Sequence, residues 1–76
     1  MHERASQMVI FYALAKAGSF TAAAKQMGVS TSHVSKQLGA LEETINVKLV
    51  HRTTRSLTLT DAGQQFFYIA RRYTAQ

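Results

Sequence analysis

The sequence predicts a mainly α-helical domain with one small β-hairpin, which is the winged helix-turn-helix fold class. Apolar residues recur at helical spacing in three segments before Asn46. The second and third of these segments are joined by a short glycine turn. After Asn46 the pattern changes to β-prone stretches, and a last helical segment follows. With 76 residues, 46% of them apolar, the chain is sized for a single core.

The first two helices are predicted at residues 5–17 and 20–27. Gly18 can end the first helix in the left-handed conformation. Ser19 can cap the second by accepting a hydrogen bond from its free amides. The faces expected to point inward are Met8, Phe11, Leu14 and Ala15 in the first helix, and Phe20, Ala23, Ala24 and Met27 in the second. The alanines are small, so the two helices can cross closely.

A third helix is predicted at residues 30–45, with Ser30 as its cap. Its apolar stripe consists of Val34, Leu38, Leu41 and Ile45. The opposite face near the N-terminus is short, polar and cationic, so it can enter a major groove and offer donors and acceptors to base edges. Alone, this face is more typical of an ordinary solvated helix. Its place after the Gly28 turn favours the reading helix of a helix-turn-helix.

Two strands are predicted next, at residues 47–52 and 56–59, which makes residues 47–59 a wing with Arg52 and Arg55 at or near its tip. Thr60 is expected to cap a last helix that begins at Asp61 and runs to the C-terminus. That helix carries more apolar surface than one neighbouring core needs, which predicts a homodimer through residues 61–76. The residues expected at this contact are Phe66, Phe67, Ile69, Ala70 and Tyr73.

The net charge of +5 is concentrated in the second half of the chain. Residues 1–46 carry four basic and three acidic side chains, whereas residues 47–76 carry five basic side chains and one acidic. A cationic half of this kind predicts a polyanionic partner. The absence of cysteine fits a reducing compartment, and no disulfide or thiolate metal site is expected.

Membrane and enzyme functions are not predicted. The apolar stretch at residues 8–15 is short for a signal peptide and reads better as an amphipathic helix, so a cytoplasmic protein is expected. No apolar run approaches the ~20 residues that span a bilayer. The histidines lack zinc-site spacing, the four glycines form no phosphate loop, and the adjacent carboxylates Glu42 and Glu43 diverge on a helix. We therefore expect no catalytic residue, no cofactor and no metal.

Four motifs together resemble the N-terminal DNA-binding domain of the LysR-type transcriptional regulators. They are GSFTAAA at residues 18–24, VSKQL at 34–38, ALE at 40–42 and RTTRSLTLTDAG at 52–63. Their order and spacing match the family over residues 8–76. The resemblance implies a winged helix-turn-helix at residues 1–60 and the start of a linker and dimerisation helix at residues 61–76. It also implies a larger effector-binding domain, which this sequence does not contain.

By the same resemblance, the DNA-binding residues fall on Thr31, Ser32, His33, Ser35, Lys36, Arg52 and Arg55. Lys36 can donate to guanine or to a phosphate. For Arg52, a salt bridge to Glu42 competes evenly with DNA contact. Many members have Gln-Pro where this chain has Thr31-Ser32, so operators known for other members do not transfer to it.

The implied partners are double-stranded DNA, expected as an inverted-repeat operator, a second copy of the chain and, for a full-length protein, RNA polymerase. The other function that the residues leave open is a winged-helix protein-interaction module with a basic docking face. Such a face usually carries aromatic anchors, which the outer face of the predicted helix at residues 30–45 lacks.

Overall fold

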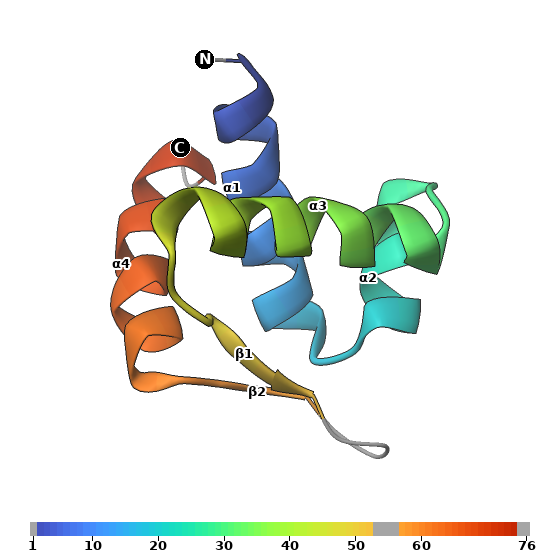
Figure 1. Ribbon diagram of the computed structural model, residues 1–76. Helices are drawn as coiled ribbons and strands as arrows, with labels where there is room; N and C mark the ends of the chain where they lie inside the picture. The colour runs from blue at the N-terminus through green and yellow to red at the C-terminus, as the bar shows by residue number, and fades with distance from the viewer. Residues whose placement is uncertain (1, 53–56, 75–76) are drawn as a thin grey trace.

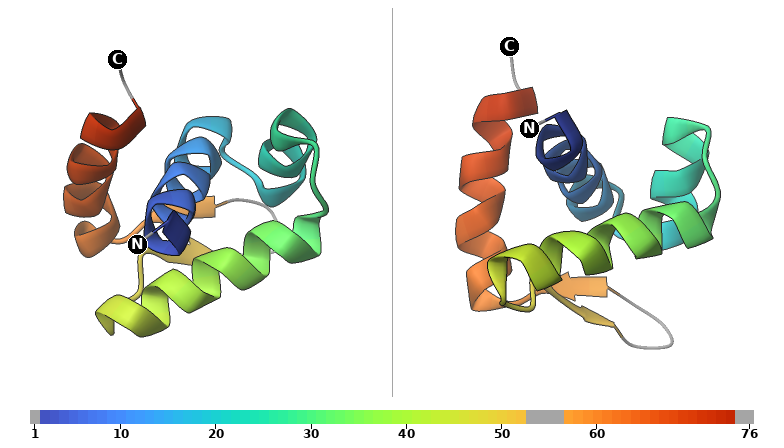
Figure 2. Two further views of the ribbon diagram at one scale, coloured as in Figure 1. Left: turned by 90° about the horizontal axis from the view of Figure 1, so that it is seen from above. Right: turned by 45° about the horizontal axis from the view of Figure 1, so that its top comes forward.

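Helix α1 lies at the centre of the molecule and contacts each of the other three helices, as the computed structural model of residues 2–52 and 57–74 shows (Figure 1). The elements are α1 (His2–Ala17), α2 (Phe20–Met27), α3 (Thr31–Ile45), β1 (Val50–Arg52), β2 (Leu57–Leu59) and α4 (Asp61–Thr74). Figure 2 shows α2 and α4 on opposite sides of α1, with α3 crossing below them. The predicted winged helix-turn-helix fold is confirmed, with α1 beginning before the expected residue 5.

The helix-turn-helix is set by local backbone chemistry. The Oγ of Ser19 accepts a hydrogen bond from the N–H of Ala22 at 3.0 Å, which caps α2. Gly28 ends α2 with φ of 69°, a left-handed conformation that costs glycine nothing. The Oγ of Ser30 then accepts from the N–H of His33 at 3.0 Å and starts α3. These caps fix the sharp change of direction that presents α3 at the surface.

The core is built on the inward face of α1. Phe11 and Leu14 from α1 and Leu41 from α3 have no exposed surface. The ring of Phe11 meets that of Phe66 from α4 edge-on, with ring centroids 5.6 Å apart. One apolar cluster therefore joins α1, α3 and α4, and it leaves the polar side of α3 facing outward.

The first strand is shorter than predicted, because residues 47–49 do not join it. Asn46 adopts the left-handed conformation with φ of 58°, and the N–H of Val47 donates to the carbonyl of Glu42 at 3.1 Å. The amide of Leu49 donates to a side chain rather than to a neighbouring strand. Only β1 pairs antiparallel with β2, in the register Val50↔Leu59, His51↔Thr58 and Arg52↔Leu57. The predicted strand residue Ser56 lies outside the described residues.

The start of α4 is fixed against residues 48 and 49. The backbone N–H of Thr60 donates to the carbonyl of Leu49 at 3.0 Å. The hydroxyl of Thr60 donates to the carbonyl of Lys48 at 2.7 Å and accepts from the N–H of Gly63 at 2.9 Å. Gly63 packs so closely on the backbone that a Cβ there would overlap the carbonyl oxygen of Leu49.

We expect Leu41→Ala to lower the free energy of unfolding by about 2–5 kcal/mol, because it leaves a cavity where the core elements meet. Chemical denaturation monitored by circular dichroism measures this loss. Val47→Ala is the control: Val47 is exposed, so its change should stay within about 0.5 kcal/mol. A loss below about 1 kcal/mol for Leu41→Ala would contradict the burial of this residue.

Alanine substitutions at Gly63 and Gly39 should change stability in opposite directions. Gly63→Ala should destabilise the domain by about 1–3 kcal/mol, because backbone atoms of Leu49 must move. A Cβ on Gly39 meets open space, so Gly39→Ala should stabilise by about 1 kcal/mol through helix propensity. Equal effects in the same denaturation experiment would contradict the close approach of α4 to Leu49.

Candidate nucleic-acid interface

The N-terminal turns of α3 carry most of the predicted DNA-binding residues, and the structure brings four of them together. An open hollow is lined by Thr31, Ser32, Ser35 and Lys36 from α3 and by Phe20 from α2. Thr31, Ser32 and Lys36 are exposed and Ser35 is half-buried. Three hydroxyls and one ammonium group therefore converge on one side of the helix. His33 is exposed on the same turn but is not among the residues that line the hollow.

Arg52 reaches from β1 to the same place. Its Nη1 donates to Oγ of Ser35 at 3.3 Å, and its Cζ lies 5.0 Å from the centroid of the Phe20 ring. A guanidinium over an aromatic face is attracted by the ring electrons. The guanidinium of Arg52, which belongs to the wing, therefore lies at the edge of the α3 hollow, near Lys36.

Of the two roles open for Arg52, the salt bridge to Glu42 is not the one that the structure contains. Glu42 is buried, and its Oε2 accepts from the backbone N–H of Leu49 at 2.8 Å and of Val50 at 3.4 Å. Its Oε1 lies 3.9 Å from Nζ of Lys48. These groups occupy the carboxylate of Glu42, and the guanidinium of Arg52 lies instead at Ser35 and Phe20.

The roles of two residues in this region, Phe20 and Glu42, were not predicted from the sequence. Phe20 was assigned only to the core, whereas it also supports Arg52. Glu42 was considered only as a salt-bridge partner, whereas it binds the backbone of the wing. A signal for Glu42 was present: it follows Leu38 by four residues, so it stands at the edge of the apolar stripe and faces inward.

A groove continues from the hollow along α3 and β1. Its walls include Lys36 and Gly39 from α3 and Val50 and Arg52 from β1. His51 also lines it and is exposed. The groove is open, and its charged lining is mixed: Lys36, Lys48 and Arg52 together with Glu42 and Glu43. Arg55, the other predicted wing cation, lies outside the described residues.

The residues predicted for dimerisation on α4 divide into two groups. Phe66 and Phe67 pack on aromatic rings of α1, Phe67 stacking on Tyr12 with centroids 5.0 Å apart, and Ala70 is fully buried. These three therefore pack within the chain, with Phe66 and Phe67 half-buried, and a dimer contact through α4 stays a prediction. Ile69 remains 49% exposed. The side chain of Tyr73 lies outside the described residues.

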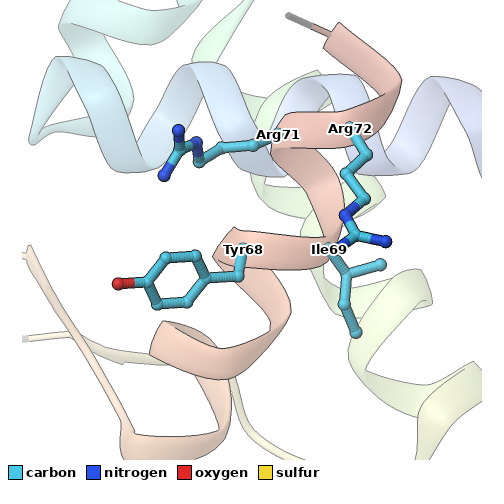
Figure 3. A pocket seen from close by; sticks show the side chains of 4 residues that line it. All are labelled: Tyr68, Ile69, Arg71 and Arg72. Carbon is cyan, nitrogen blue, oxygen red and sulfur yellow. The ribbon is translucent and has the colours of Figure 1, made fainter.

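The exposed side of α4 has a mixed apolar and cationic character. Figure 3 shows Tyr68 and Arg71 extending to one side of the helix and Ile69 and Arg72 to the other. Tyr68 is 68% exposed, and Cζ of Arg71 lies 5.7 Å from the centroid of its ring. Tyr68 and Ile69 are the exposed large apolar side chains of α4 among the described residues.

Within residues 2–52 and 57–74, no group of three or more His, Cys, Asp or Glu side chains is placed to hold a metal ion. Among the helices of that same part of the chain, none is long and apolar enough to cross a membrane.

Comparison with known proteins gives one consistent family. The model of the bacterial regulatory helix-turn-helix protein, lysR family, matches residues 5–64. The chain is 43% identical over 70 residues to the HTH-type transcriptional activator AaeR of Escherichia coli, covering 92% of this chain and 23% of AaeR. It is 44% identical over 71 residues to the HTH-type transcriptional regulator PtxR of Pseudomonas aeruginosa, covering 93% and 23%. The chain thus spans about a quarter of the length of these curated relatives.

A solved structure agrees with these relatives. The structure of the CbnR_DBD–DNA complex superposes with a TM-score of 0.87 and 41% sequence identity, covering 90% of this chain and 78% of that one. This similarity extends beyond fold alone, since its sequence identity approaches that of the curated relatives.

Proposed function

This chain belongs to the lysR family of bacterial regulatory helix-turn-helix proteins and is a sequence-specific DNA-binding domain, and from that premise we propose how it meets DNA. Helix α3 enters the major groove, and the β1–β2 wing lies on the backbone or in the adjacent minor groove. The relatives are transcription regulators, so the part that this chain represents is not an enzyme.

One observation carries the proposal: the hollow at the start of α3 collects hydroxyls and a cation on an otherwise unobstructed helix face. Hydroxyls of Thr31, Ser32 and Ser35 can donate to or accept from base edges, and Lys36 can donate to O6 or N7 of guanine. Such groups distinguish base pairs in the major groove. The cationic wing supplies contacts to phosphate, which set the register but carry no sequence information.

The positions of the two wing arginines suggest different tasks. Arg52 stands beside Ser35, so we assign it to a phosphate next to the N-terminal turns of α3. Arg55 follows it by three residues in the predicted turn, and we assign it to phosphate or to a narrow minor groove. His33 on the flank of α3 is assigned to a base or a phosphate.

Two copies of the chain would read an inverted repeat. We assign the contact between them to the exposed side of α4, with Tyr68 and Ile69 as its apolar part. A two-fold dimer places the two α3 helices on successive half-sites of one face of the duplex. For the full-length protein, RNA polymerase is the expected further partner, and the cytoplasm is where both partners are found.

We expect Lys36→Ala to weaken binding to the preferred duplex by about 1–3 kcal/mol and to scrambled duplex far less, because the lost contact reads a base. Arg55→Ala should weaken both duplexes evenly and reduce the salt slope by about one ion per subunit. Fluorescence anisotropy at several salt concentrations, with the preferred duplex taken from selection on random DNA, measures both effects.

Lys16→Ala is the matched control for charge, because Lys16 is exposed in the last turn of α1 and belongs neither to α3, nor to the wing, nor to α4. It should leave the ratio of specific to scrambled affinity unchanged. Loss of the same ratio in Lys16→Ala as in Lys36→Ala would contradict the assignment of α3 as the reader. A wild-type chain without any duplex preference would refute the mode of binding as a whole.

Ile69→Glu should shift the chain toward the monomer in sedimentation at tens of micromolar, because a carboxylate in an apolar contact must be desolvated without a partner. Ile69 is exposed, so the fold should persist. Thr21→Glu on α2 adds the same charge away from α4 and should leave the mass unchanged. A wild-type chain that sediments as a monomer, with or without DNA, would exclude the α4 dimer.

A further inference from the structure

Residues 49–52, at the start of the wing, are attached to α3 at two points. At one point, the carboxylate of Glu42 accepts from the amides of Leu49 and Val50, at 2.8 and 3.4 Å. At the other, the guanidinium of Arg52 donates to the hydroxyl of Ser35 at 3.3 Å. Both side chains of α3 thus hold the same short segment of the wing.

The spacing of the two points matches on both elements. Ser35 and Glu42 are seven residues apart on α3, two helical turns or roughly 10.5 Å along its axis. Leu49 and Arg52 are three residues apart, which spans roughly 10 Å of extended chain. The segment therefore runs antiparallel to α3, with one of the two points near each of its ends.

The two points differ in what else they do. Ser35 and Arg52 are assigned to the DNA surface itself, so their substitution removes contacts to DNA as well as the fastening. Glu42 is only 6% exposed and carries the charge that a phosphate repels. A carboxylate in this position can favour DNA binding only through the residues that it holds.

Because Glu42 is buried, its carboxylate depends on the hydrogen bonds that it accepts from backbone amides. Burying a carboxylate costs free energy unless hydrogen bonds satisfy it. Hydrogen bonds in which one partner is charged are among the stronger ones in proteins. The nearby ammonium of Lys48 adds little, because that side chain is 83% exposed and 3.9 Å away. The backbone amides of Leu49 and Val50 are therefore the main hydrogen-bond partners of the carboxylate.

We propose that Glu42 is a positioning residue for DNA binding, which orients the wing on α3 so that the wing cations and the α3 hollow engage one duplex together. This role rests on the proposed function. The expected change in DNA affinity is opposite to the one that simple electrostatics predicts. Removal of an acidic charge ordinarily strengthens binding to a polyanion, whereas removal of the Glu42 charge weakens it.

The test compares Glu42→Gln with Glu43→Gln in the full chain. Glu43 is the next residue, is exposed, and loses the same charge when substituted. We expect Glu42→Gln to bind the preferred duplex about tenfold more weakly than Glu43→Gln at the same salt concentration, the loss expected for one charged hydrogen-bonded contact. Glu43→Gln should bind as well as the wild type or slightly better. The salt slope should also fall in Glu42→Gln alone, because wing cations leave the phosphates.

A role in stability alone gives a different result. It would lower the melting temperature of Glu42→Gln but leave its affinity unchanged well below that temperature. Amide hydrogen exchange makes the distinction local: exchange at Leu49 and Val50 should accelerate in Glu42→Gln while amides of α1 keep their protection. If Glu42→Gln does not fold, Glu42→Asp and Glu43→Asp provide a second pair, in which charge is kept and only reach is shortened.

Affinities of Glu42→Gln and Glu43→Gln within twofold of each other would overturn the proposal, whatever the exchange data show. The same holds for the aspartate pair. Absence of duplex binding by the wild type would refute the proposed function and this inference with it, whereas equal binding by the paired variants refutes the inference alone.

Discussion

The structure depends on the burial of one face of α1 by three other helices. Phe11 and Leu14 have no exposed surface, and α2, α3 and α4 all pack against α1. A domain of this size buries a modest share of its surface, so no part of that core is surplus. The outward polar face of α3 is a consequence, because the side of the helix that carries Leu41 must turn inward.

The helices could be predicted from the sequence because their signals are local. Ser19, Gly28 and Ser30 act on amides and dihedral angles within a few residues, and the structure confirms each of them. The polar cluster on α3 was also predictable, since four positions on a helix share a face whatever surrounds it. The beginning of β1 could not be predicted. Residues 47–49 have strand propensity, but the left-handed Asn46 and the hydrogen bonds to Glu42 keep them out of the strand.

Hydrophobic periodicity could not predict which elements pack against each other. An apolar helix face shows that something covers it but not what: Phe66 and Phe67 could meet a second chain or α1, and they meet α1. The same holds for Glu42, whose inward position was visible while its backbone partners depend on how the wing returns. Gly63 belongs here as well, because the carbonyl that excludes a side chain there comes from a distant part of the chain.

The hydrogen bond between Arg52 and Ser35 limits what the hydroxyl can still accept. A serine hydroxyl has one proton and two lone pairs, and here a lone pair already receives the guanidinium N–H. The proton is not used in that bond, so the hydroxyl keeps it for donation to another acceptor. With one of its two lone pairs occupied, the Ser35 hydroxyl has less capacity to accept a further hydrogen bond and an unchanged capacity to donate one. The stacked guanidinium has also lost much of its rotamer freedom before DNA arrives, so less entropy is lost on binding.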